Sequence, residues 1–362
     1  MPDKSARHSA LHIIAPGICG PLADISPLAS KPVITRWIKT LSRAHNSVSA
    51  ENTHALLAAL SGQTFNNDFP SAVFTLLAND LYDPDRFYMH ADPVHLQADI
   101  DSALLTPGAD LNISEAEAEG FCQTLNQHFA EDGLTFLALN NNRWFVSSKE
   151  EIKLETTSLL DATGRNINYL LPAGEDAVRW KQMLTEAQML LHAHELNENR
   201  ENTGLASINS LWFHGSGQLP ENFPAQQAHS EPATINHVAI NHVCSNDDLL
   251  KGFSRFIKCE HMALPDSVNA YTDYLLSCDT GVNNVLHLDT LQALTNYTDV
   301  QPWLAQLETV LHNWLYPLLS FSNKNNIKVT LYPCTEKQYR FEKSDVLKFW
   351  RKDPLEKHVK RY

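Results

Sequence analysis

The sequence has 362 residues, of which 43% are hydrophobic, so it is long enough for one large α/β domain or two ordinary ones and too apolar for a disordered chain. Its formal net charge of −14 repels nucleic-acid phosphates and anionic lipids, so we expect neither a nucleic-acid partner nor a membrane partner. The six cysteines form no Cys-x-x-Cys pair, and the apolar run near the N-terminus is too short for a signal peptide, which favours a cytoplasmic location.

The first predicted element is a short buried strand. Residues 11–15 form an apolar run that ends at Pro16 and Gly17. Apolar residues then recur at helical spacing over 51–60 and 71–81, before a Pro-containing turn interrupts the chain. We expect this region, up to residue 83, to be the first part of a main domain.

The next segment, 84–172, has a different pattern. Ser114 and Glu117 form a capping box ahead of a predicted helix. Two apolar stretches, 134–139 and 143–147, flank an asparagine-rich turn and predict a β-hairpin. We therefore expect a small α+β lobe over 84–172 that packs on the main domain.

The remainder of the chain, 173–362, predicts helices alternating with strands. Residues 174–200 form the clearest helix because they carry a single apolar stripe, and a core strand follows at Ile208–Phe213. This alternation predicts an α/β main domain over 1–83 and 173–362, with a mostly parallel sheet and helices on both faces. The further strand candidates are 234–243, 285–288 and 327–331.

The glycine-containing turn after the core strand is a candidate ligand-binding site. It lacks the first glycine of the Gly-x-Ser-x-Gly nucleophile elbow, because that position is a histidine. Two glycines let backbone N–H groups approach an anion, whereas the alternative interpretation is a strand end that simply turns through glycine. The predicted ligand-binding residues are Arg165, Asn168, Asn209, Trp212, His214, Gly215 and Gly217.

A second candidate set contains histidines and carboxylates. Pro93 bends residues 90–95, which can bring two histidines and an aspartate together. The helix that ends near residue 132 carries carboxylates where they oppose its dipole, which indicates a tertiary partner for them. An exposed acidic loop and a buried ion pair are the alternative interpretations. The acid/base or metal candidates are His90, Asp92, His95, His128, Glu131 and Asp132.

Seven short segments occur in an order that is similar to a known family, namely Asp92–Leu96, His128–Gly133, Arg143–Trp144, Gly164–Asn168, Glu186–His192, Asn209–Gly217 and Phe349–Leu355. Over nearly its whole length the chain resembles the proteobacterial RpfE-type regulatory proteins, which are related to the cofactor-independent phosphoglycerate mutases. The resemblance implies an alkaline-phosphatase-like fold. It also implies a superfamily whose active members transfer phosphoryl groups with two metal ions.

The chain departs from the active members at the positions of their metal ligands. Those members place an aspartate and a nucleophile after the first strand, and they contain Asp-x-x-x-His and Asp-His motifs. Here Pro16–Gly20 follows the first strand, and neither motif occurs in the sequence. Cys19 and Ser26 are candidate nucleophiles by position, although they lack a carboxylate cage to activate them.

The resemblance therefore implies a phosphoglycerate-mutase-like protein that has lost the two-metal site. We expect a regulatory or ligand-binding protein with no cofactor, whose partner is a phosphorylated small molecule or a regulatory protein. A purely structural interaction protein is a further alternative. The enzymatic alternative is an active phosphoglycerate mutase or phosphatase with a divalent metal and a rebuilt site around His90, Asp92, His95, His128 and Glu131.

Overall fold

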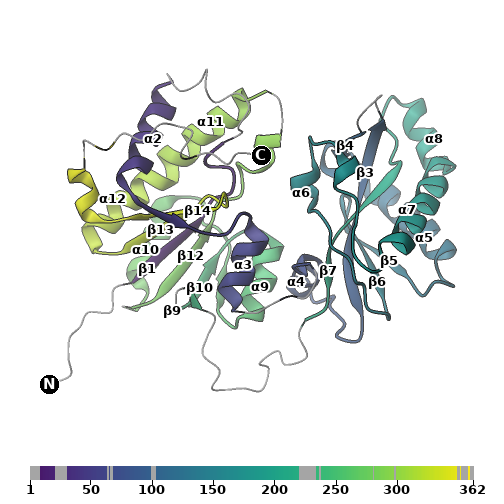
Figure 1. Ribbon diagram of the computed structural model, residues 1–362, viewed down its shortest axis with the longest axis horizontal. Helices are drawn as coiled ribbons and strands as arrows, with labels where there is room; N and C mark the ends of the chain where they lie inside the picture. Colours follow the sequence, from purple (N-terminus) through teal and green to yellow (C-terminus); the bar gives the residue numbers. More distant parts are fainter. Residues whose placement is uncertain are drawn as a thin grey trace. The chain divides into compact units, whose positions relative to one another are not determined.

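The computed structural model describes residues 9–20, 31–62, 65, 68–98, 103–219, 234–235, 238–279, 281–296, 299–348, 351 and 358. The chain has a mixed α/β fold and divides into two compact units (Figure 1). Unit 1 combines Met1–Gln63 with Gln227–Tyr362, and unit 2 is Thr64–Gln226. None of the described helices has both the length and the apolar content needed to cross a bilayer.

Unit 1 contains a seven-stranded sheet with the order β11-β10-β12-β1-β13-β14-β2. The five strands from β11 to β13 are parallel, and β14 and β2 extend the sheet in antiparallel pairing. The mostly parallel sheet predicted from the sequence is therefore confirmed for this unit. The strands are β1 (Ala10–Ile14), β2 (His45–Val48), β10 (His242–Cys244), β11 (Glu260–Met262), β12 (Asn283–His287), β13 (Lys328–Tyr332) and β14 (Lys337–Phe341).

Helices cover both faces of this sheet (Figure 1). On one face, Ile13, Leu286 and Leu331 pack in one apolar cluster with Trp37 and Trp303 from the helices. A π-helical turn continues α11 directly into α12 on this face. The helices are α2 (Pro32–Arg43), α10 (Val268–Ser277), α11 (Gln301–Val310) and α12 (Tyr316–Asn325) on this face, with α3 (Thr53–Ser61) and α9 (Asp248–Phe256) on the other.

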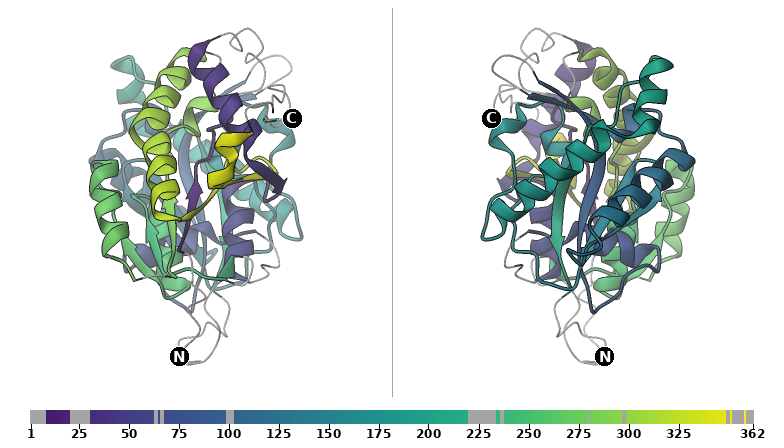
Figure 2. Two further views of the ribbon diagram at one scale, coloured as in Figure 1. Left: turned by 90° about the vertical axis from the view of Figure 1, so that its left-hand side faces the viewer. Right: turned by 90° about the vertical axis from the view of Figure 1, so that its right-hand side faces the viewer.

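Unit 2 contains a five-stranded antiparallel sheet. Its strand order is β4-β3-β6-β5, and β7 also pairs with β3, outside this linear order. Three helices pack on one face, where Figure 2 shows them in its right-hand view, and shorter segments cover the other face. The elements are β3 (Phe87–Ala98), β4 (Ala103–Pro107), β5 (Thr135–Asn140), β6 (Arg143–Ser148) and β7 (Ser210–Gly217), with α5 (Glu115–His128), α7 (Ala177–His192) and α8 (Glu195–Asn202) on the first face and α4 (Ser71–Ala78) and α6 (Leu159–Ala162) on the second.

The predicted core strand Ile208–Phe213 differs from the expectation. It corresponds to β7, which belongs to the antiparallel sheet of unit 2 and not to the main parallel sheet. Phe213 packs with the α7 side of the sheet, whereas Trp212 packs with the α6 side. Burial on both faces accounts for the consecutive apolar residues Leu211, Trp212 and Phe213, and such a run is also the pattern of a parallel strand. Unit 2 therefore extends well beyond the predicted lobe at 84–172.

The capping box of α5 is present as predicted. The Ser114 side chain accepts a hydrogen bond from the Glu117 backbone N–H at 3.3 Å, and the Glu117 carboxylate accepts one from the Ser114 N–H at 2.8 Å. We predict that Ser114→Ala lowers the free energy of unfolding by about 1 kcal/mol, because alanine lacks the side-chain oxygen that accepts the hydrogen bond from the Glu117 N–H. Urea denaturation measures the loss. Gln127→Ala, an exposed change on the same helix, is the control, and equal effects of the two variants would contradict the prediction.

Glu117 also gives a prediction about pH. Burial raises the pKa of Glu117, but hydrogen bonds from Ser114 and Arg200 outweigh burial, so the pKa lies below its ordinary value. A lowered folded-state pKa stabilises the protein above the unfolded pKa, and this stabilisation is lost as pH falls through the folded pKa. We expect the difference in unfolding free energy between wild type and Glu117→Gln to shrink as pH falls from 7 toward about 3. A difference that does not depend on pH would contradict this expectation.

Candidate functional site

The parallel strands β10 and β12 end side by side in unit 1. They are paired in register, with Cys244 opposite Leu286, so the residues that follow them meet at one edge of the sheet. Open α/β sheets bind ligands at this carboxyl edge. The ligand atoms of Asp247, His287 and Asp289 all lie within 4.8 Å of one another there. We call these three residues the carboxyl-edge cluster.

Neighbouring groups orient two members of this cluster. The Nδ1 atom of the buried His287 ring lies 3.1 Å from the Ser245 hydroxyl, which leaves Nε2 for another ligand. Asp247 caps α9 by accepting a hydrogen bond from the Leu249 N–H at 2.7 Å through Oδ1, which leaves its second oxygen available. Asp289 is exposed. The cluster therefore combines two fixed ligands with one carboxylate that faces solvent.

Burial favours the neutral form of His287. Burial lowers the pKa of His287, and the nearby carboxylates of Asp247 and Asp289 oppose this shift without reversing it. Neutral imidazole is the form that ligates metal ions. One imidazole and two carboxylates suit a divalent ion such as Mn²⁺ or Zn²⁺, and three protein ligands leave positions open for water or phosphate oxygens.

Sequence reasoning missed the carboxyl-edge cluster, although a signal was present. Asp247 and Asp289 come shortly after the predicted strands 234–243 and 285–288, where ligand residues of a parallel sheet are expected. No local motif links these residues, so their proximity depends on the pairing of β10 with β12.

The candidate nucleophiles near this edge have different outcomes. Cys19 is buried, and burial raises its pKa to about 12, so the thiol is protonated at neutral pH and is not an activated nucleophile. Ser26 lies outside the described residues. Ser245, which follows β10, is 0% exposed and contacts His287, so its hydroxyl orients the ring and does not face a ligand.

In unit 2 the structure joins residues from both predicted sets. His90 and His214 are direct partners across β3 and β7, and their rings stack with centroids 4.3 Å apart. The His214 Nε2 atom lies 3.0 Å from Asp92 Oδ2, and the His90 Nδ1 atom lies 3.9 Å from the same oxygen. We call His90, Asp92 and His214 the buried triad. Residue alternation on β3 places its first two members on one face of the sheet.

The other predicted ligand-binding residues have structural contacts or lie at the surface. The Asn209 side chain bonds both the N–H and the carbonyl of Leu96, at 2.7 and 2.9 Å. The buried Trp212 donates from Nε1 to the Thr157 carbonyl at 2.8 Å. Arg165 and Asn168 are exposed. The structure does not gather these residues around one ligand.

The two glycines of the turn allow close packing of α4. Gly215 has φ +64°, and a Cβ atom at this position would lie 1.9 Å from the Ser71 hydroxyl oxygen. A Cβ atom at Gly217 would lie 2.8 Å from the Pro70 side chain. This geometry explains both glycines without a ligand, and it therefore favours the interpretation of a strand end that turns through glycine.

The remaining acid/base and metal candidates lie apart from the buried triad. His95 is at an odd spacing from His90 on β3, so it faces the opposite side of the sheet, where its Nδ1 atom lies 2.7 Å from the Ser207 carbonyl. His128 is exposed at the end of α5 and pairs with Glu186 at 3.0 Å. Glu131 and Asp132 are exposed. Of the predicted rebuilt site, the structure therefore brings His90 and Asp92 together and places His95, His128 and Glu131 elsewhere.

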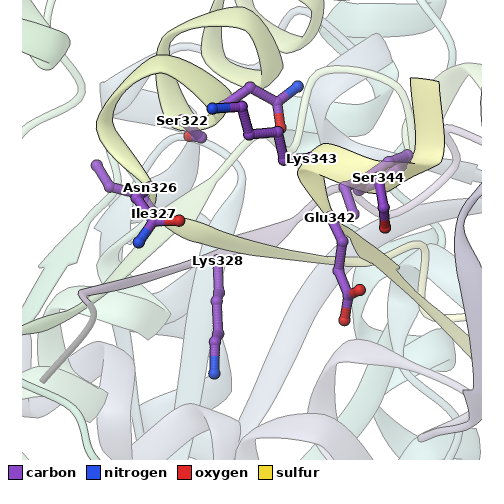
Figure 3. A pocket seen from close by; sticks show the side chains of 9 residues that line it. Ser322, Asn326, Ile327, Lys328, Glu342, Lys343 and Ser344 are labelled. Carbon is purple, nitrogen blue, oxygen red and sulfur yellow. The ribbon is translucent and has the colours of Figure 1, made fainter. Parts of the chain in front are cut away.

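Two hollows in the described surface lie away from these clusters. One, of about 370 Å³, lies at the start of β13, the opposite edge of the unit 1 sheet from the carboxyl-edge cluster (Figure 3). The Lys328 side chain points away from Ser322 and Lys343 in this view, so the two lysines do not converge on one anion. The other hollow, of about 650 Å³, lies in unit 2 beside His128 and Met189.

The chain is similar in sequence to archaeal phosphoglycerate mutases. It is 27% identical over 143 residues to the 2,3-bisphosphoglycerate-independent phosphoglycerate mutase of Methanosarcina barkeri, a match that covers 39% of this chain and 34% of that protein. It is 25% identical over 167 residues to 2,3-bisphosphoglycerate-independent phosphoglycerate mutase 2 of Methanothermobacter thermautotrophicus, covering 45% and 39% of the two chains. The matches thus span less than half of these relatives. No family model matches the chain.

A solved structure supports the fold. The PH0037 protein from Pyrococcus horikoshii aligns with a TM-score of 0.52 and 14% identity, over 92% of this chain and 87% of that one. At this identity the likeness shows the mixed α/β fold alone. The sequence matches point to the cofactor-independent phosphoglycerate mutase superfamily, and they do not single out the RpfE-type regulatory proteins.

Proposed function

We propose that the protein binds a phosphorylated small molecule at the carboxyl edge of the unit 1 sheet, through one divalent cation held by Asp247, His287 and Asp289. The observation that carries this proposal is the grouping of three ligand atoms within 4.8 Å at the ends of two paired parallel strands. Such cations commonly bind one or two carboxylates together with ligand phosphates. The relatives, named as phosphoglycerate mutases, suggest the class of ligand.

Binding is better supported than turnover. Transfer through a covalent intermediate needs an activated nucleophile that faces the ligand. Cys19 is held protonated by burial, and the Ser245 hydroxyl is buried against His287. Two-metal transfer also needs a second set of ligands about 4 Å from the first ion. Among the described residues of unit 1, Asp247, His287 and Asp289 form a single such set. We therefore propose a phosphoglycerate-mutase-like protein with a binding or regulatory role.

Calorimetric titration with Mn²⁺ tests the cation site. After removal of metals with a chelator, we expect Asp289→Asn to bind Mn²⁺ at the carboxyl-edge cluster at least about 10-fold more weakly than wild type, because a neutral amide replaces an anionic ligand. Asp266→Asn, an exposed change in the same unit, is the matched control and should bind as wild type does. Equal Mn²⁺ affinity in Asp289→Asn and wild type would contradict the proposed site.

A further inference from the structure

The buried triad of unit 2 has the composition of a transition-metal site. His90, Asp92 and His214 are 5%, 4% and 7% exposed, and their ligand atoms all lie within 4.8 Å of one another. Two imidazoles and one carboxylate are a ligand set found with Zn²⁺ and Fe²⁺. The two strands that carry these residues pair in continuous register from His90 to Val94 of β3, so the backbone fixes the spacing of the ligands.

Surrounding groups fix the orientation of the triad. The Trp144 backbone N–H donates to Asp92 Oδ1 at 3.0 Å, which leaves Oδ2 facing the two histidine rings. The His90 ring makes two ring contacts. It packs against Phe145, with centroids 4.7 Å apart, and it stacks on the His214 ring. Metal sites depend on such supporting contacts, which hold the first ligands in place.

The charge and polarity of this site also favour a cation. Asp92 is a buried carboxylate, and its ion-pair partners among the described residues are two histidines, with no lysine or arginine. A divalent ion would balance the charge of a buried carboxylate that has no lysine or arginine partner. The Ser71 hydroxyl, which lies beside Gly215 near the His90 ring, is buried without a hydrogen-bond partner among the described residues. Such orphaned polar groups are rare in folded proteins unless a water or an ion contacts them.

We propose that His90, Asp92 and His214 bind one transition-metal ion of the Zn²⁺ class within unit 2. The site is separate from the carboxyl-edge cluster and does not depend on the proposed function. Because its ligands come from β3 and β7, the ion ties these two strands together. We therefore expect metal binding to stabilise unit 2 as well as to be measurable directly.

Metal analysis of the full chain tests this site in a background in which the carboxyl-edge cluster has lost one of its ligands. In Asp289→Asn protein that has been stripped with chelator and reloaded with Zn²⁺, we expect one Zn²⁺ per chain. Adding His214→Gln should weaken Zn²⁺ binding at least about 10-fold, as loss of a ligand contact does. Adding His192→Gln, which removes an exposed histidine of unit 2, should leave the Zn²⁺ content unchanged. Equal Zn²⁺ retention in the His214 and His192 variants would overturn the proposal.

A second measurement applies even where His214→Gln does not fold. Co²⁺ added to stripped Asp289→Asn protein should give the visible absorption of a low-coordinate ion with nitrogen ligands, and Zn²⁺ should abolish this absorption by displacement. Zn²⁺ should also raise the unfolding midpoint of this protein. Absence of both the Co²⁺ absorption and the Zn²⁺ stabilisation would show that the triad is only a hydrogen-bonded network, and would overturn the proposal.

Discussion

Replacing Arg200 by alanine is expected to lower the free energy of unfolding of unit 2 by about 3 kcal/mol or more, because it removes one partner of a buried ion pair. Arg200 is 2% exposed and lies on α8. Its guanidinium donates to the Glu117 carboxylate at 2.8 Å, to the Ala206 carbonyl at 2.8 Å, and to the Leu111 carbonyl. Alanine leaves all three acceptors without this donor, and the desolvation cost is largest for the Leu111 carbonyl, whose bond to Arg200 is buried.

Urea denaturation measures this loss, and a surface ion pair provides the matched control. Arg179 donates to Glu150 at the same distance of 2.8 Å, but both side chains are largely exposed. Arg179→Ala should therefore cost less than about 1 kcal/mol. Arg200→Lys should recover only part of the stability, because lysine keeps the charge but lacks the planar fork of donors. Similar losses in Arg200→Ala and Arg179→Ala would contradict this account of unit 2.

Gly215→Ala is expected to destabilise unit 2 by about 2–4 kcal/mol, for two separate reasons. The backbone at Gly215 has φ +64°, which costs an L-residue about 1–2 kcal/mol. The added Cβ atom would also lie 1.9 Å from the Ser71 hydroxyl oxygen, so α4 or β7 must shift. Overpacking of this kind typically costs about 1–3 kcal/mol more.

Two further variants separate these contributions. Gly133 has φ +72° with no atom within 4 Å of an added Cβ, so Gly133→Ala carries the backbone cost alone. Ser71→Ala removes the clashing oxygen, so adding it to Gly215→Ala should restore the steric part of the loss. The prediction is wrong if Gly215→Ala is no more destabilising than Gly133→Ala in thermal or urea unfolding.

The sequence predicts where the individual strands of this fold lie better than it predicts which strands pair with one another. β1, β12 and β13 were predicted because short apolar runs bounded by turn residues are typical of buried strands. The sheet membership of β7 could not be predicted in the same way. An apolar run shows that both faces of a strand are covered, whereas its direction depends on β3, more than 100 residues earlier in the chain.

The same reasoning applies to the candidate sites. His90, Asp92 and His214 were singled out from different local patterns, but only strand pairing brings the two histidines together. The prediction that no cofactor is needed used the missing family motifs, and it overlooked Asp247 and Asp289. Our proposal of a bound cation departs from that prediction, because proximity of ligands across paired strands leaves no signature in a local motif.

Phosphorus NMR of 3-phosphoglycerate with Mn²⁺-loaded protein tests the central claim most directly. A phosphate bound at a paramagnetic ion has a broadened resonance, so we predict broadening with wild type and with Asp266→Asn, and much less with Asp289→Asn. We also predict that no resonance of 2-phosphoglycerate appears, because no activated nucleophile faces the carboxyl-edge cluster among the described residues. Equal broadening in all three proteins, or conversion to 2-phosphoglycerate, would contradict a single-cation binding protein.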